Sequence, residues 1–310
     1  MKILVAYDGS PYSESAIDDL KRAGLPPQGE AIIFSVAEVW LPPADAEDIH
    51  LTDDPYIHNV VSKRQEKSQQ ALAEVQDRAK TAEERLKNIL PDWTVSSAAT
   101  YGSPAWEIIA KADEVLPDLI VVGSQGLSGL SRFFLGSISQ KVLTEASSSV
   151  RVARGKNDVD ASPIRIAIGF DSSKGAEAAV NAVAARNWPA ETEVKLIAVT
   201  DPVKPSTIGR LMPPLTDAVD DVNDSEQQWL TEIASPMIEK LSALGLTASL
   251  EFASGNPKSV LVEAAENWNA DTIFVGANAF GSKIERFLIG STSSAVAARA
   301  HCTVEVVRTT

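Results

Sequence analysis

An internal duplication constrains the fold of this chain more than any other feature of its sequence. Residues 3–10 (ILVAYDGS) recur as residues 166–173 (IAIGFDSS), and each is an apolar run that ends in an aspartate and small polar residues. Further matches join 31–39 to 194–202, 101–109 to 254–262, and RFFLGS at 132–137 to RFLIGS at 286–291. A unit of roughly 150 residues that occurs twice is itself the domain.

A polar stretch separates the two copies. The sequence GKNDVDASP at 155–163 lies between the last apolar run of the first copy and the first apolar run of the second. We therefore expect one domain over residues 1–156 and another over residues 164–310. With 310 residues and 44% hydrophobic content, each copy has enough apolar material for its own core.

Within each copy, short apolar runs alternate with amphipathic helical patterns. The strands expected in the first copy are Ile3–Tyr7, Ala31–Val36, Val95–Ala99, Leu119–Val122 and Val150–Ala153. The expected helices are Ser13–Ala23, a long helix from about residue 60 to residue 90, one that begins at Pro104 and one that follows Ser137. This alternation predicts an α/β fold with an open, doubly wound parallel sheet in each copy.

The stretch from Leu119 to Ile138 (LIVVGSQGLSGLSRFFLGSI) is the strongest functional signal. A buried strand ends abruptly in Gly123, and glycines allow the backbone to approach a ligand closely. The helix expected after Gly136 would then present free N–H groups and a partial positive charge. Such a turn is suited to hold phosphate groups, with Ser137 as an additional hydroxyl donor.

The spacing of these residues is Gly123, two residues, Gly126, nine residues and then Gly136-Ser137. It is neither a Walker loop nor the dinucleotide fingerprint. It resembles the ATP-binding signature of the universal stress protein family at every fixed position. The resemblance implies a Rossmann-like, adenine nucleotide alpha hydrolase-like fold with strand order 3-2-1-4-5, in which the ends of the first and fourth strands flank one crevice.

The resemblance also implies a role for each matching residue of the first copy. Asp8 and the backbone of Val36 would hold the adenine, Gly123 would line the ribose, and Gly126, Gly136, Ser137 and Ile138 would bind the phosphates. Two alternatives stay open from the residues alone. Asp8 is also of the type that caps a following helix, and the glycines could serve packing only.

The second copy has equivalent positions but departs from the signature. Its candidates are Asp171, Val199, Gly276, Gly290 and Ser291. Ala279 replaces the second glycine, and ten residues instead of nine separate it from Gly290. A Cβ at a position of close phosphate approach is unfavourable, so we expect two unequal sites.

Composition excludes several classes of protein. The formal charge of −14 argues against a nucleic-acid-binding surface. The N-terminus lacks the length of a signal peptide, and no run approaches the ~18 apolar residues of a membrane span, so a cytoplasmic location is expected. His50 and His58 lie in an acidic insert whose spacing matches no ligand motif, so no metal site is assigned there.

The sequence thus predicts a cytoplasmic tandem universal stress protein that binds ATP, with Mg²⁺ or another divalent ion, and acts as a stress sensor or regulator through nucleotide-dependent conformation or assembly. No catalytic residue is assigned. The alternatives are a slow ATPase or phosphotransferase, and a nucleotide-free interaction scaffold. The closing strands Val150–Ala153 and Val304–Val307 are expected at sheet edges, where the two copies would pair as a pseudo-dimer within the chain, and whole chains could pair as a homodimer.

Overall fold

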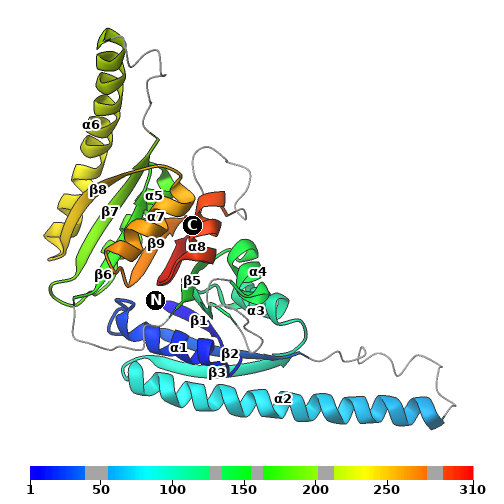
Figure 1. Cartoon of the computed structure of the whole chain (residues 1–310). Coiled ribbons are helices and arrows are strands. Elements are labelled where there is room, and N and C mark those ends of the chain that lie inside the picture. Colours follow the sequence, from blue (N-terminus) through cyan, green and yellow to red (C-terminus); the bar gives the residue numbers. More distant parts are fainter. Residues whose placement is uncertain (39–54, 126–134, 155–162, 202–212, 278–288, 310) are drawn as a thin grey trace. The chain divides into compact units, whose positions relative to one another are not determined.

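The computed structural model describes residues 1–38, 55–125, 135–154, 163–201, 213–277 and 289–309, without the side chains of 55–62 and 213–220. The chain forms two compact units. Unit 1 is built mainly from residues up to Ala153, and unit 2 mainly from Arg154 onward. Figure 1 shows strands and helices alternating within each of them.

Unit 1 is a parallel sheet with helices on both faces. Its strands are β1 (Lys2–Ala6), β2 (Glu30–Ala37), β3 (Thr94–Tyr101), β4 (Leu119–Gly123) and β5 (Ser149–Ala153). Its helices are α1 (Pro11–Asp19), followed by the short 3-10 helix η1 (Leu20–Arg22), then α2 (Pro55–Ile89), α3 (Pro104–Val115) and α4 (Ser137–Glu145). The strand order β3-β2-β1-β4-β5, parallel throughout, confirms the predicted order 3-2-1-4-5.

Unit 2 repeats this arrangement. Its strands are β6 (Arg165–Phe170), β7 (Glu193–Thr200), β8 (Thr247–Ser254), β9 (Thr272–Gly276) and β10 (Thr303–Val307). Its helices are α5 (Lys174–Ala184), α6 (Pro213–Ala243), α7 (Pro257–Asn267) and α8 (Ser291–Arg299). The strands follow the order β8-β7-β6-β9-β10, so the internal duplication of the sequence is also a duplication of topology.

The order of the strands determines which helices share a face of the sheet. In unit 1 the chain first moves outward from β1 to β3 and then returns to the other side of β1 with β4 and β5. Because parallel crossovers are right-handed, this reversal places α1 and α2 on one face and α3 and α4 on the other. The contacts between α1 and α2, and between α3 and α4, agree with this division.

The first helix begins earlier than its apolar pattern predicts. Ser10 caps it, since the Ser10 side chain accepts a hydrogen bond from the Ser13 N–H group at 3.2 Å. Pro11 then occupies the first helical position, where a missing N–H group is harmless. The observed helix, Pro11–Asp19, therefore replaces the expected Ser13–Ala23, and η1 tightens its last turn.

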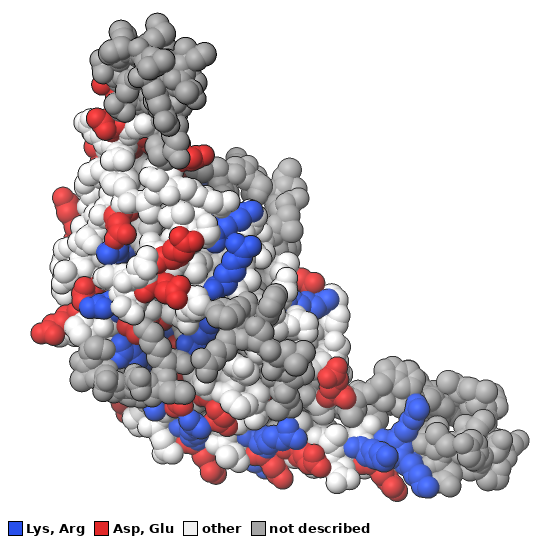
Figure 2. Space-filling view, viewed as in Figure 1, with Lys and Arg blue, Asp and Glu red and all other residues white. Residues whose placement is uncertain are grey.

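The long helix α2 is amphipathic. Ala79, Ala82 and Leu86 are buried on one stripe, and α2 contacts β2 and β3. Figure 2 shows acidic and basic side chains intermixed along its solvent side. None of the helices in the described parts of the chain has the length and apolar character needed to cross a bilayer.

The central strands of unit 1 are buried on both faces. Side chains of β1 and β4, including Ile3, Val5, Leu119 and Val121, have 0% exposure. Each such aliphatic side chain contributes on the order of 1.5–3 kcal/mol when it leaves water. The two strands that flank the expected crevice are thus anchored by their buried residues, and their carboxyl ends can build a site.

The closing strand of each unit carries one buried charge. In unit 1 the Nε of Arg151 lies 2.6 Å from a carboxylate oxygen of Asp19, and the two side chains are 0% and 9% exposed. In unit 2 the sign is reversed, because Glu305 of β10 forms an ion pair with Arg186. Each charge therefore has a partner of opposite sign within its own unit.

We predict that Arg151→Ala lowers the free energy of unfolding by about 3–5 kcal/mol, because it leaves the Asp19 carboxylate buried without its guanidinium. Guanidinium unfolding followed by circular dichroism measures this loss. Lys21→Ala is the matched control: it removes an exposed pair with Asp18, whose side chains are 42% and 38% exposed, and should cost less than about 1 kcal/mol. Equal losses for the two variants would contradict this assignment.

Glycine at the end of β9 is required by a close approach of helix α5. A Cβ built on Gly276 would lie 2.3–2.5 Å from backbone atoms of Gly175, which cannot move without displacing the helix. The equivalent Gly123 of β4 would meet the backbone of Tyr12 at 2.9 Å. In both units the helix after the first strand therefore packs directly on the end of the fourth strand.

Gly276→Ala should consequently destabilise unit 2 by about 1–3 kcal/mol, the usual cost of forcing extra volume into a packed contact. Thermal unfolding of the full chain measures this. Gly169→Ala is the matched control, because its Cβ would meet a Leu261 methyl group at 2.9 Å, and a side chain can rotate away. A smaller effect of Gly276→Ala than of Gly169→Ala would show that the helix does not pack as described.

Candidate functional site

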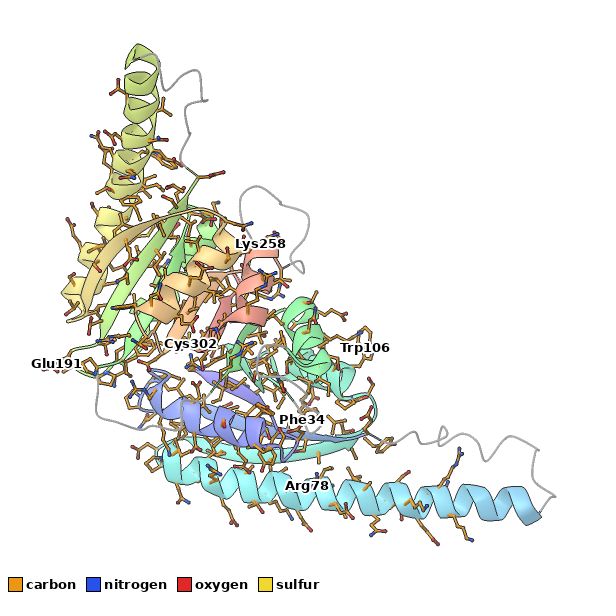
Figure 3. The ribbon with its side chains drawn as sticks, viewed as in Figure 1. Phe34, Arg78, Trp106, Glu191, Lys258 and Cys302 are labelled. Carbon is orange, nitrogen blue, oxygen red and sulfur yellow. The ribbon has the colours of Figure 1, made fainter. Side chains whose placement is uncertain are left out.

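Unit 1 contains a cavity of about 460 Å³ at the carboxyl ends of β1, β2 and β4. This volume is in the usual range for sites that bind small molecules. Its walls come from these strand ends, from α2 and α3, and from the start of α4. Figure 3 labels Phe34 on β2 and Arg78 on α2, which belong to two of these walls. The position is the one where the strand order reverses, which is where open α/β sheets bind ligands.

The first residues of α4 form one end of the cavity. Gly136, the N-cap residue, is extended (φ −60°, ψ 150°), and its cap has no side-chain hydrogen bond. The Gly136 N–H donates to the Ser124 carbonyl at 2.8 Å, and the Ser139 hydroxyl donates to the Gly123 carbonyl at 2.7 Å. These bonds tie the helix start to the end of β4. The amides of its first turn have no acceptor within the helix, so they can receive an anion.

Asp8 follows β1 directly and also lines the cavity. One of its carboxylate oxygens accepts from the Ser10 N–H at 2.9 Å, which fixes the turn into α1. The N-cap of α1 is Ser10, so the alternative in which Asp8 caps the helix is wrong. Asp8 is therefore held by its own turn, with its second carboxylate oxygen unpartnered among the described residues.

Val36 lines the cavity from β2, beyond the last paired residue of β1. The ladder between these strands ends at the pair Ala6 and Phe34, where the Phe34 carbonyl accepts from the Tyr7 N–H at 2.9 Å. Backbone groups of residues i and i+2 in a strand point to the same side. The N–H and C=O of Val36 are thus directed past the end of β1 towards the cavity, where they can bind the edge of a planar ring.

The long helix α2 forms a wall that the sequence did not indicate. Ala71, Glu74, Val75 and Arg78 line the cavity from this helix. The polar pair Glu74 and Arg78 is joined by an ion pair of 3.7 Å. The apolar periodicity of α2 predicts the face that lies on the sheet, but it carries no information about which turn of a 35-residue helix passes the crevice.

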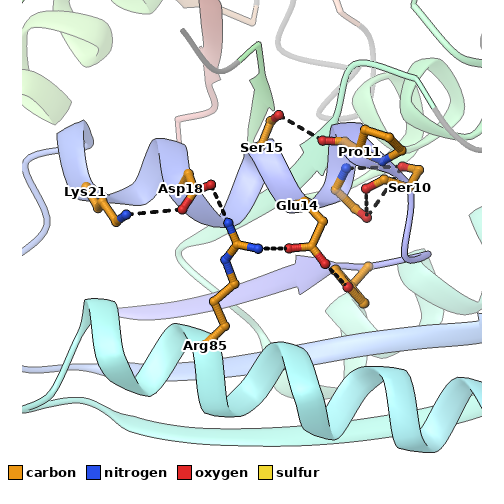
Figure 4. Close-up of polar contacts among 9 residues, drawn as sticks. Ser10, Pro11, Glu14, Ser15, Asp18, Lys21 and Arg85 are labelled. Atoms are coloured by element: carbon orange, nitrogen blue, oxygen red, sulfur yellow. Dashed lines mark hydrogen bonds and ion pairs between the residues drawn. The ribbon is translucent and has the colours of Figure 1, made fainter. Parts of the chain in front are cut away.

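A polar network holds α2 against α1 beside the cavity (Figure 4). Arg85 of α2 forms ion pairs with both Glu14 and Asp18 of α1. The Tyr7 hydroxyl, at the end of β1, donates to Glu14. Burial, and then the Glu14 carboxylate, raise the pKa of Tyr7, so its phenol stays protonated as a donor. The position of the α2 wall is therefore fixed by α1 and by the strand end.

Most of the predicted site residues of the first copy meet at this one cavity. They are Asp8, Val36, Gly123, Gly136, Ser137 and Ile138. Gly126, the second glycine of the signature, lies outside the described residues. The lining residues that sequence reasoning missed include those of α2 and α3, Ser13 of α1, Gln125 after β4, and neighbours of the predicted residues at the strand ends and on α4.

Unit 2 repeats the framework of this site. Asp171 accepts from the Ser173 N–H at 3.0 Å, and Ser173 caps α5. The Ser293 hydroxyl donates to the Gly276 carbonyl at 2.5 Å, and the Gly290 N–H donates to the Ala277 carbonyl at 2.6 Å. Ala279, where the signature is altered, lies outside the described residues.

A second cavity, of about 430 Å³, is found in unit 2 away from the strand ends that carry the predicted residues. It lies between β7, β8 and α7, with Glu251, Glu263 and Trp268 among its lining residues. Asp171, Val199, Gly276, Gly290 and Ser291 do not line it. The two units thus share their backbone framework, and the cavity of about 460 Å³ lies at the strand ends of unit 1.

Comparison with known proteins agrees with the duplicated framework. The sequence profile of the universal stress protein family matches residues 1–154 and again residues 164–308. The chain is 29% identical over 154 residues to universal stress protein YxiE of Bacillus subtilis, covering 49% of this chain and 98% of that protein. It is 30% identical over 152 residues to a universal stress protein of Thermus aquaticus, covering 49% of this chain and 97% of that protein.

A solved structure shows the same fold along the whole chain. The crystal structure of a universal stress protein from Archaeoglobus fulgidus superposes with a TM-score of 0.57 at 22% identity, covering 99% of this chain and 96% of that chain. The profile matches account for nearly all of the sequence, and each match corresponds to one copy of the repeat. The chain therefore belongs to the universal stress protein family and carries two copies of the family's domain in tandem.

Proposed function

We propose that this protein binds ATP in the cavity of unit 1 and acts as a cytoplasmic stress-response sensor or regulator, through nucleotide-dependent conformation or assembly. One observation carries the proposal: the Asp8 carboxylate and the uncapped start of α4 line the same cavity. A carboxylate accepts from an amine or a hydroxyl, whereas free amides receive phosphate oxygens. A ligand with a polar base at one end and phosphates at the other can bind to the carboxylate and to the free amides at the same time.

In the proposed complex, each signature residue has one role. Asp8 and the backbone of Val36 hold the adenine, and Gly123 lines the ribose. Gly126, Gly136, Ser137 and Ile138 bind the phosphates through backbone amides and the Ser137 hydroxyl. The geometry of Val36, whose backbone groups point past the end of β1, supports its assignment to the base.

A divalent cation such as Mg²⁺ would enter with the triphosphate. The described residues contain no cluster of three His, Cys, Asp or Glu side chains that could hold a metal ion. Mg²⁺ in nucleotide sites is bound largely by phosphate oxygens and water, and Ser137 can accept from such a water. The charge of the triphosphate would thus be balanced by the ion and by the helix start.

We propose binding rather than efficient catalysis. Among the described residues that line the cavity, Arg78 is the one cationic side chain. Fast phosphoryl transfer requires cations at the transferred phosphate and a group that positions the nucleophile. Measurement of phosphate release tests the slow-ATPase alternative, in which Asp8→Ala and Gly126→Val would abolish turnover.

The second unit is proposed as a weaker or altered site. Asp171, Val199, Gly276, Gly290 and Ser291 occupy the equivalent positions, and the altered glycine spacing argues against full occupancy. The proposed domains are 1–156 and 164–310. If unit 2 does not bind nucleotide, its proposed role is that of an interaction scaffold beside unit 1.

We further propose that the two units act as a pseudo-dimer paired through their closing strands, with no part for nucleic acid or a membrane. β5 and β10 each end the strand order of their own unit, and open strand edges favour pairing. Light scattering distinguishes a single chain of 33.1 kDa from a homodimer of whole chains.

Calorimetric titration of the full chain with ATP and Mg²⁺ should show one strong site and a second that is at least about tenfold weaker or absent, because only the first copy keeps the full signature. Two equal, tight sites would refute this. ADP, GTP and cAMP serve as comparison ligands, the last because one universal stress protein has been crystallised with cAMP.

The matched variants Asp8→Ala and Asp171→Ala assign the strong site to one unit. Asp8→Ala should weaken it at least about tenfold, the loss expected when a buried polar group of the ligand loses its acceptor. Asp171→Ala should leave it unchanged. The reverse pattern would place the strong site in unit 2. Melting temperatures of both variants report whether the turn before α1 or α5 has stayed intact.

A further inference from the structure

We propose that Arg78 of α2 covers the base of the bound nucleotide, with Glu74 as the residue that positions it. This inference rests on the proposed function and extends the site to a helix outside the glycine signature. Both side chains line the cavity, and both are on the same face of α2, one turn apart.

Arg78 lies against the turn that carries Asp8. Its Nη1 is 3.5 Å from the Asp8 carbonyl oxygen, and its Cδ would be 3.2 Å from a Cβ built on Gly9. Gly9 has a positive φ of 78°, so glycine is favoured there by the backbone as well as by the space that Arg78 occupies. The guanidinium therefore lies beside the backbone of the turn whose Asp8 carboxylate is proposed to hold the adenine.

Arg78 and the proposed phosphate end of the cavity belong to helices that lie on opposite faces of the sheet. α2 contacts α1 on one face, whereas α4, whose first turn would receive the phosphates, contacts α3 on the other face. The cavity crosses the carboxyl ends of the strands between these two sides. Arg78 is thus placed at the base rather than at the phosphates.

The chemistry of the pair suits a purine. A planar guanidinium stacks on aromatic rings and attracts their faces, and Arg does this more often than Lys. The carboxylate of Glu74, 3.7 Å from Nη2, limits the orientations that the guanidinium can adopt. The Arg78 side chain is 46% exposed in this structure, so a base could cover it without displacing the protein core.

The second unit lacks this pair. Buried residues show which positions of α6 are equivalent to those of α2. Ala79 and Leu86 are buried seven residues apart in α2, and Ala234 and Leu241 are buried with the same spacing in α6. The residues before the two leucines confirm the register, since Arg85 bonds to Asp18 of α1 and Lys240 bonds to Asn181 of α5.

In this register Arg78 corresponds to Ile233 and Glu74 to Trp229. Ile233 packs against the core of unit 2, and Trp229 is 49% exposed. Neither side chain offers a charge or a guanidinium plane. The difference in α6 therefore adds to the altered glycine loop as a reason for unequal sites.

Titration of the full chain with ATP and with AMP tests the position of Arg78. Arg78→Ala should weaken both ligands by about tenfold and by the same factor, because both carry the base. Lys80→Ala is the matched control, an exposed cation on the same helix that does not line the cavity, and it should leave both affinities unchanged. Glu74→Gln should weaken both ligands by a smaller factor.

Two results would overturn the inference. A loss of affinity for ATP with unchanged affinity for AMP would place Arg78 at the outer phosphates, and unchanged affinity for both would remove it from the site. In either case the wild-type chain still binds ATP, so the proposed function stands. Failure of the wild type to bind any adenine nucleotide would overturn the proposed function together with this inference. Circular dichroism of Arg78→Ala verifies that α2 is intact.

Discussion

The reversal of strand order beside β1 is the constraint on which the rest of unit 1 depends. β1 and β4 are neighbours, but the chain continues from β1 to β2 on one side and from β4 to β5 on the other. The helices that follow the two strands therefore cover opposite faces of the sheet. Their carboxyl ends are left without a covering connection, and a cavity forms there. The buried side chains of both strands hold these ends in place, the Ser10 N–H bond fixes the turn at Asp8, and the Gly136 N–H bond to Ser124 ties the start of α4 to the end of β4.

Helix α2 completes the cavity because α1 holds it. Arg85 bridges Glu14 and Asp18, and Tyr7 links the same network to the end of β1. These contacts lie partly at the surface, where each ion pair alone contributes little, but they share one guanidinium and two helices. A ligand that touches Arg78 would contact the same helix that this network positions, which gives the proposed sensor a physical connection between its site and its longest helix.

The framework of the fold could be predicted from the sequence, because it depends on patterns that repeat. Apolar runs ending in Asp8 and Asp171 indicated the first strand of each unit, and Gly123 and Gly136 indicated the end of β4 and the start of α4. The start of α1 was predicted late, because Ser10 and Pro11 set it through capping and not through apolar periodicity. The wall formed by α2 could not be predicted, since a helix of 35 residues has many turns and only three-dimensional packing selects the one at Arg78.

A crystal structure of the full chain grown with ATP and Mg²⁺ tests the central claim most directly. The account predicts phosphate density at the backbone amides of Gly136, Ser137 and Ile138, with the base between Asp8 and α2. Nucleotide bound elsewhere, or a cavity filled by the protein's own side chains in the presence of saturating ATP, would contradict it and leave a duplicated α/β scaffold without a nucleotide site.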